Sequence, residues 1–223
     1  MKITEPSTTR RSLLALPLAL AAMSALAGFG AGLMSFAGTA GAAPRPGTPA
    51  PDFTGVDSNA QTLRLSDFQG KLVVLEWTND GCPFVGKWYQ SGAMQQLQRD
   101  ATARGAVWLS VISSAPGQQG FVDGGRANQL TQERNAAPSR VLLDPRGVIG
   151  HLYDARTTPE IFVIAPDGTL AYMGGADSIA STREEDLAKA EPFAREAIFA
   201  VFDGKPVLHP VTRPYGCTVK YAD

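Results

Sequence analysis

The apolar positions of this chain form short continuous runs that alternate with longer segments of helical periodicity. A continuous apolar run between turn residues is typical of a strand that is buried on both faces of a sheet. The last two such runs flank Pro166-Asp167-Gly168, which is typical of a hairpin turn. The predicted strands comprise residues 63–65, 71–77, 106–112, 140–143, 161–165 and 170–173, and the first of them leads into a capped turn that ends at residue 70.

The longest segment of helical periodicity, residues 83–103, is expected to form one helix that stops at Gly105. Residues 184–202 are expected to form the last helix, with a break or kink at Pro192. A surface helix and a short helical turn complete the pattern, and they comprise residues 121–135 and 148–153.

The predicted elements follow the order β-α-β-α-β-α-β-β-α. This order predicts an α/β fold with a central mixed sheet and helices on both faces. One domain of this kind is expected over residues 52–207. A flexible lead-in over 44–51 would precede it, and a tail over 208–223 would follow it.

The first 43 residues are expected to be an export signal and no part of the fold. Thr9-Arg10-Arg11-Ser12-Leu13-Leu14 is a twin-arginine pattern, and no further charge follows it until Arg45. Ala40-Gly41-Ala42 is typical of a cleavage site with small residues. The expected location is therefore periplasmic or secreted, and an uncleaved membrane anchor is the alternative.

Charge and composition argue against several classes of function for this chain. The chain has 20 basic and 21 acidic residues, so no basic surface for nucleic acid is expected. His151 and His209 are the only histidines and show no metal spacing, so neither a metal site nor a cofactor is predicted. The sequence contains no Gly-rich phosphate loop, and it makes no prediction of oligomeric state.

Cys82 is the leading candidate for chemistry, because it stands where a buried strand and a polar turn meet a predicted helix. The free N–H groups and the positive dipole of a helix N-terminus favour the thiolate, which is the reactive form of cysteine. Pro83 suits the first helical turn, where its missing N–H costs nothing. The polar turn before Cys82 predicts partial exposure of the thiol. Asp80 in that turn would raise the thiol pKa, and Lys87 one helical turn later would lower it.

The run from Trp77 to Val85, WTNDGCPFV, together with the C-terminal GCTVKY of residues 216–221, resembles the thioredoxin superfamily. The closest branch is the secreted, peroxiredoxin-like one of the alkyl hydroperoxide reductase and thiol-specific antioxidant type. The resemblance covers the chain from about Thr48 onward. It implies a thioredoxin-like fold, with Val85 in place of the second cysteine of the C-x-x-C motif.

The resemblance also implies how the site is built. Thr158-Pro159 matches the threonine–proline pair of the superfamily, whose proline is cis and packs beside the active cysteine. Peroxiredoxins carry a threonine three residues before that cysteine, where this chain has Asn79 and, one residue earlier, Thr78. They also place an arginine beside the cysteine. Arg140 and Arg156 are the candidates for it here.

Cys217 is the only other cysteine, and it allows more than one interpretation. On a tail that Pro210, Pro214 and Gly216 would leave without rigid secondary structure of its own, it can resolve a sulfenic acid at Cys82 by forming a disulfide. Alternatively, the two cysteines form a permanent disulfide that stabilises the fold.

The resulting prediction is an exported, thiol-dependent redox protein. The leading function is a peroxidase that uses Cys82 and Cys217, with an external thiol or dithiol as reductant. The alternatives are a periplasmic thiol–disulfide oxidoreductase that acts on protein disulfides, and a non-catalytic domain with a structural disulfide.

Overall fold

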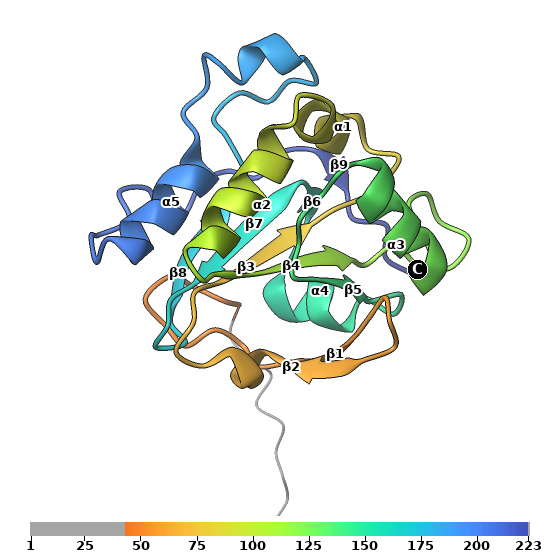
Figure 1. Cartoon of the computed structure of the whole chain (residues 1–223), viewed down its shortest axis with the longest axis horizontal. Coiled ribbons are helices and arrows are strands. Elements are labelled where there is room, and N and C mark those ends of the chain that lie inside the picture. Colours follow the sequence, from red (N-terminus) through yellow and green to blue (C-terminus); the bar gives the residue numbers. More distant parts are fainter. Residues whose placement is uncertain (1–42, 223) are drawn as a thin grey trace, which may run out of the picture. The chain divides into compact units, whose positions relative to one another are not determined.

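The structure, a computed structural model, describes residues 43–222 (Figure 1). The twin-arginine pattern and the cleavage sequence Ala40-Gly41-Ala42 therefore lie outside the described residues. Within the described part of the chain, none of the helices has the length and apolar character needed to cross a lipid bilayer.

A seven-stranded mixed sheet organises residues 43–222. Its strands are β1 (Thr54–Asp57), β2 (Thr62–Arg64), β3 (Val73–Trp77), β4 (Val107–Ile112), β5 (Arg140–Leu143), β7 (Glu160–Ile164) and β8 (Leu170–Gly174). Their order across the sheet is β2-β1-β5-β4-β3-β7-β8 (Figure 1). The neighbours β3, β4 and β5 run parallel, whereas β7 runs antiparallel to β3, and β8 to β7. The expected α/β fold with a mixed central sheet is confirmed.

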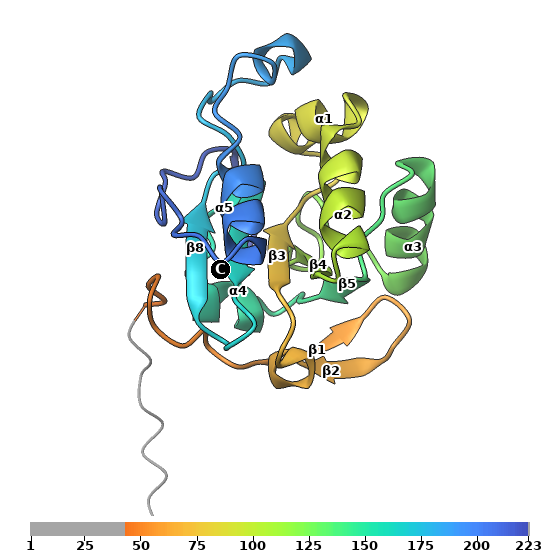
Figure 2. The ribbon, with the colours of Figure 1, turned by 60° about the vertical axis from the view of Figure 1, so that its left-hand side comes forward.

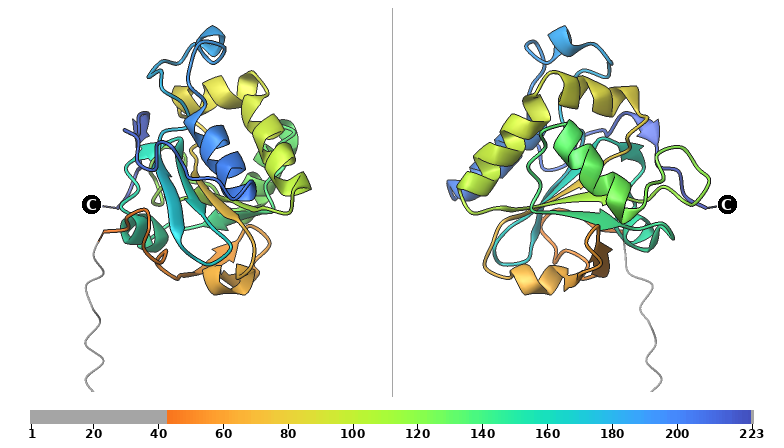
Figure 3. Two further views of the ribbon diagram at one scale, coloured as in Figure 1. Left: turned by 90° about the vertical axis from the view of Figure 1, so that its left-hand side faces the viewer. Right: turned by 45° about the vertical axis from the view of Figure 1, so that its right-hand side comes forward.

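Helices cover both faces of this sheet (Figures 2 and 3). They are α1 (Pro83–Gln90), α2 (Ala93–Ala103), α3 (Gly124–Glu133), α4 (Val148–Tyr153) and α5 (Phe193–Phe202). The helices α1, α2 and α5 pack on one face through side chains that include Trp88, Met94 and Ile198. On the opposite face, α4 contributes Ile149 and Tyr153. Because both faces are covered, all five residues of β3 are buried, which explains its continuous apolar run.

One ionisable side chain lies in the middle of this core. Glu76 of β3 is fully buried. Its Oε1 accepts a hydrogen bond from the Tyr89 hydroxyl at 2.8 Å. Its Oε2 accepts from Trp108 Nε1 at 2.8 Å, from Ser110 Oγ at 3.0 Å and from Gln98 Nε2 at 3.1 Å. Burial raises the pKa of Glu76, and these four donors oppose the rise.

Two predicted helices are wrong in extent. The expected helix over 83–103 is two helices, because Ser91 and Gly92 separate α1 from α2, and Gly92 has a φ of +79°. The left-handed conformation at Gly92 turns the chain and ends the first helix. The expected helix over 184–202 is a short 3-10 turn, Glu184–Asp186, followed by α5, which begins immediately after Pro192. The break at Pro192 was expected, and no helix continues across it.

The N-terminal stretch of the described residues is attached to the sheet. Thr48 and Gly47 exchange backbone hydrogen bonds with Leu170, and the Ala50 N–H donates to the carbonyl of Gly168. Residues 47–50, which were expected to be a flexible lead-in, therefore run beside the start of β8. The strand β1, which has only four residues and exposes every second one, has no counterpart among the predicted strands.

Candidate thiol redox site

Cys82 lies at the N-cap of α1, after the turn that follows β3, and Pro83 occupies the first helical position. Asn79 shapes this turn. Its carbonyl accepts the Cys82 N–H at 3.2 Å, and its Oδ1 accepts the Gly81 N–H at 2.9 Å. Its Nδ2 donates to the carbonyl and to the side chain of Gln119, each at 3.2 Å. The buried Asn79 side chain therefore fixes the backbone that presents Cys82.

The Cys82 thiol is buried, with 2% of the residue exposed. Its Sγ donates a hydrogen bond to the carbonyl oxygen of Thr158 at 3.1 Å. The expectation of partial exposure is therefore wrong. Although the turn before the thiol is polar, segments distant in sequence cover the sulfur.

Thr158 and Cys217 belong to the segments that cover it. The Thr158–Pro159 peptide bond is cis, as the resemblance implied. Thr158 lies in the two-residue strand β6 (Thr157–Thr158), which pairs antiparallel with β9 (Cys217–Thr218), and Thr158 lies opposite Cys217. Gly216 makes this approach possible. Its φ is +144°, and a Cβ atom at this position would lie 2.0 Å from the Thr158 oxygen.

The C-terminal tail has little secondary structure of its own, as predicted, since the two-residue β9 is the one named element within residues 208–222. Hydrogen bonds nevertheless attach the residues that follow Cys217 to the rest of the fold. The Val219 N–H donates to the Arg156 carbonyl at 3.0 Å, and the Ala115 N–H donates to the Lys220 carbonyl at 2.7 Å. The Tyr221 hydroxyl donates to the Ala155 carbonyl at 2.7 Å.

Both cysteines are free thiols, and their pKa values move in opposite directions. Burial acts to raise the pKa of Cys82. Hydrogen bonds from the Cys217 thiol, the Thr158 hydroxyl and the backbone N–H groups of Val85 and Cys217 outweigh burial and lower it. Burial and the neighbouring Cys82 raise the pKa of Cys217 to about 11. Of the two, Cys82 is therefore the cysteine that forms a thiolate more readily.

The arginines chosen from the sequence do not lie beside Cys82. Arg140 pairs with Asp57, with 3.3 Å between Nε and Oδ2, and Arg156 pairs with Asp154. The two charges expected to act on the thiol are also engaged elsewhere. Asp80 pairs with Arg134, and the buried Lys87 pairs with Asp177. The pKa of Cys82 is thus set by burial and hydrogen bonds.

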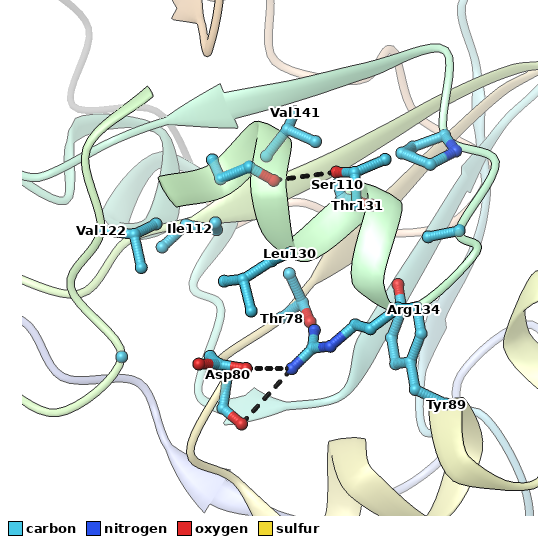
Figure 4. A pocket seen from close by; sticks show the side chains of 14 residues that line it. Thr78, Asp80, Tyr89, Ser110, Ile112, Val122, Leu130, Thr131, Arg134 and Val141 are labelled. Carbon is cyan, nitrogen blue, oxygen red and sulfur yellow. Dashed lines mark hydrogen bonds and ion pairs between the residues drawn. The ribbon is translucent and has the colours of Figure 1, made fainter. Parts of the chain in front are cut away.

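Thr78 lies in a separate cavity (Figure 4). This space of about 30 Å³ is enclosed mainly by β4, β5 and α3, and Asp80, Tyr89 and Arg134 also line it. Within residues 43–222, the buried Thr78 Oγ1 has no hydrogen-bond partner. A cavity of this size holds one or two water molecules. Because Cys82 does not line it, the structure does not bring the Thr78 hydroxyl to the sulfur.

Glu160 is a site residue that the sequence analysis did not find. It follows the cis-proline directly and is buried. Its Oε2 accepts the N–H groups of Arg156 at 2.7 Å and Thr157 at 3.0 Å, so it holds the segment that leads to Thr158. The available signal was a charged residue directly between Pro159 and the apolar run of the predicted strand 161–165. No group of three or more side chains able to hold a metal ion occurs within residues 43–222.

The arrangement of strands, with a cis-proline segment beside a cysteine at a helix N-terminus, is that of a thioredoxin-like protein. More particularly, the sequence profile of the AhpC/TSA family matches residues 46–173, and the chain belongs to this family. Membership supports a thiol redox function. None of the curated protein sequences matches the chain.

Solved structures of three proteins share the fold. A hypothetical protein from Sinorhizobium meliloti 1021 is 21% identical with a TM-score of 0.67, over 81% of this chain and 97% of that one. An uncharacterized conserved protein from Geobacillus kaustophilus is 22% identical with a TM-score of 0.66, over 79% and 92%. A putative protein disulfide isomerase from Bacteroides thetaiotaomicron is 16% identical with a TM-score of 0.52, over 72% and 91%.

Proposed function

We propose that this protein is an exported thiol peroxidase in which Cys82 attacks the peroxide and Cys217 resolves the product. The position of Cys217 carries the proposal. It lies opposite Thr158, whose carbonyl contacts the Cys82 sulfur, and its thiol and N–H are hydrogen-bond donors to that sulfur. A second cysteine in this position can react with an oxidised Cys82 without a large movement of the chain.

The first step forms a sulfur–oxygen bond. The Cys82 thiolate attacks one oxygen of the peroxide, and the O–O bond breaks. Sulfur is oxidised to a sulfenic acid, and the second oxygen leaves as an alkoxide or hydroxide that takes a proton from water. The donors around Cys82 favour the thiolate that this step needs.

The second step uses Cys217. Its sulfur attacks the sulfur of the sulfenic acid, a disulfide forms, and the sulfenic oxygen leaves as water. The Cys217 proton passes to the leaving oxygen, which completes the water molecule. An external dithiol then reduces the disulfide by thiol–disulfide exchange and restores both thiols.

A peroxide reaches Cys82 only if its cover moves, because the thiol is 2% exposed. The pairing of β6 with β9 is only two residues long, so displacing β9 breaks few strand hydrogen bonds. The proposed cycle therefore includes a small opening of the tail before the first step.

Exchange with protein disulfides is the second candidate. The observation in its favour is that β6 already pairs with an extended segment, namely β9. A substrate peptide that displaced β9 would add a strand to the same edge and bring its disulfide to Cys82.

One experiment separates these functions. The purified protein is given hydrogen peroxide or an organic hydroperoxide with dithiothreitol, and in parallel an insulin disulfide substrate. A peroxidase consumes peroxide and loses this activity in Cys82→Ser. Reduction of insulin with no catalysed peroxide consumption would favour the second candidate. If neither substrate reacts, both functions are rejected and a structural pair of cysteines is supported.

We also propose that residues 1–43 direct export by the twin-arginine route. The support comes from the sequence alone: Arg10-Arg11, the uncharged stretch after it, and Ala40-Gly41-Ala42. Export into an oxidising compartment suits a protein whose two thiols alternate with a disulfide.

A further inference from the structure

Lys87 is a buried lysine that the proposed chemistry does not use. It lies in α1, and 1% of the residue is exposed. Its Nζ donates to Asp177 Oδ2 at 3.0 Å, to the Ile179 carbonyl at 3.2 Å and to the Tyr215 hydroxyl at 2.9 Å. All three donors of the ammonium group are therefore satisfied.

Three separate segments meet at this ammonium group. Lys87 comes from α1, Asp177 and Ile179 come from the loop that follows β8, and Tyr215 comes from the C-terminal tail. A buried ion pair is costly to desolvate and adds little stability compared with apolar residues. Its geometric effect is more specific, since it fixes where the tail crosses α1.

The Tyr215 side chain contacts α1 through both its ring and its hydroxyl group. Its ring packs edge-on against the ring of Phe84, with 5.8 Å between centroids and 65° between planes. Burial and a hydrogen bond to Asp177 raise the pKa of the Tyr215 hydroxyl, so it stays protonated while it accepts from Lys87. The contact with Phe84 and the hydrogen bond to Lys87 both attach the tail to α1.

Both cysteines lie close in sequence to this cluster. Cys82 is the N-cap of α1, one helical turn and a residue before Lys87. Cys217 follows Tyr215 after Gly216, whose backbone is pressed against the Thr158 oxygen. The place of the Tyr215 side chain therefore sets where Cys217 enters β9, relative to the helix that carries Cys82.

We propose that Lys87 and Asp177 are positioning residues of the cysteine couple, because they hold Tyr215 against α1 and thereby hold Cys217 over Cys82. The inference rests on the proposed function, in which Cys217 resolves the oxidised Cys82. It is tested at the Tyr215 hydroxyl, which contacts neither sulfur atom.

The test compares Tyr215→Phe, which keeps the ring, with the wild type. Tyr153→Phe is the matched control, since it removes another buried hydroxyl, one that donates to the Pro51 carbonyl on the opposite face of the sheet. A double variant, Lys87→Met with Asp177→Asn, removes both buried charges together and leaves no unpaired ion. Circular dichroism and urea unfolding identify the variants that fold.

Two readouts are made on each folded variant. The first is the rate of Cys82–Cys217 disulfide formation after one equivalent of hydrogen peroxide, with dimedone to trap the sulfenic acid. The second is the pH midpoint of Cys82 alkylation by iodoacetamide, resolved by peptide mass spectrometry. The second readout needs no peroxide and depends on the donors that Cys217 supplies.

In Tyr215→Phe, disulfide formation should slow by about tenfold, as expected for the loss of a hydrogen bond to a charged group. Sulfenic acid should form as in the wild type and accumulate, and the alkylation midpoint should rise. The double variant should show the same changes, and Tyr153→Phe should show neither. Wild-type values of both quantities in Tyr215→Phe would overturn the inference.

The two proposals fail in different ways. If the wild type forms no Cys82–Cys217 disulfide with peroxide, the proposed function fails. The alkylation midpoint then still decides the positioning role, because an unchanged midpoint in Tyr215→Phe rejects it and a raised midpoint supports it.

Discussion

The carbonyl oxygen of Thr158 lies 3.1 Å from the sulfur of Cys82, and the two residues are 76 positions apart in the chain. Thr158 also pairs with Cys217 across β6 and β9. One residue thus touches both cysteine segments, so changes that shift its backbone should change the distance between the two thiols.

Cys217→Ala tests the second thiol as a donor and as a resolving group. The variant removes the thiol that donates to Cys82 and keeps the Cys217 N–H. The Cys82 pKa should therefore rise, and the iodoacetamide reaction should need a higher pH. After peroxide treatment, mass spectrometry should find sulfinic acid at Cys82, because no disulfide protects it. An unchanged alkylation profile together with no overoxidation would remove Cys217 from the mechanism.

Gly216→Ala tests the close approach of the tail to Thr158. A Cβ atom at Gly216 would lie 2.0 Å from the Thr158 oxygen, so the tail must shift. The free energy of unfolding should fall by about 1–3 kcal/mol, and disulfide formation should slow. Gly204→Ala is the control, since Gly204 also has a positive φ, of +63°, but has open space around its Cβ position. Urea unfolding of both variants provides the measurement. If the two variants lose the same unfolding free energy and form the disulfide at the same rate, the close approach of the tail to Thr158 has no special role.

Glu160→Gln tests the residue that holds the segment before Thr158. Burial raises the pKa of Glu160 from 4.5 to about 6, although the Arg156 and Thr157 N–H groups oppose the rise. The folded state therefore binds this proton more tightly than the unfolded state. The associated stability is present below pH 4.5 and is lost as the pH rises through 6, by about 2 kcal/mol in total.

Gln cannot ionise, so the difference in unfolding free energy, variant minus wild type, should increase by about 2 kcal/mol between pH 4.5 and pH 7. Urea unfolding at several pH values measures it. Glu76 also has a raised pKa, but it is present in both proteins and cancels in the difference. A difference that stays constant with pH would mean that Glu160 titrates in the same way in the folded and unfolded states.

The double variant Arg10→Lys with Arg11→Lys tests the export signal. The variant keeps the charge but removes the twin-arginine pair, so precursor should accumulate in the cytoplasm. The exported wild type should begin near Ala43 by N-terminal sequencing. A full-length chain that remains in the membrane fraction would instead support the uncleaved anchor.

The sequence predicted those parts of the fold that depend on local pattern. The run from 71 to 77 is apolar because both faces of β3 are covered, and the position of Cys82 follows from where that strand and α1 meet. The break at Gly92 had a local signal in Ser91-Gly92, which the apolar spacing on either side concealed.

The cover over Cys82 had no local signal. Whether a thiol is exposed depends on what packs over it, and here Thr158 and Cys217 do so from distant parts of the chain. The roles assigned to Arg140 and Arg156 failed for a related reason. The sequence shows that an arginine is present, but its direction depends on its acidic partner, and here Arg140 pairs with Asp57 and Arg156 with Asp154.

The break between α1 and α2 also has a consequence for the buried carboxylate of Glu76. Because the chain turns at Gly92, Tyr89 from the end of α1 and Gln98 from α2 both reach the same carboxylate. Apolar contacts alone would tolerate a slide of the two helices along the sheet. With Glu76 in place, a slide by one turn would remove two of the four donors to a buried carboxyl group, since Trp108 and Ser110 of β4 would stay and Tyr89 and Gln98 would not. The Glu76 carboxyl group thus selects one register of α1 and α2 on the sheet and disfavours registers that are shifted by a helical turn.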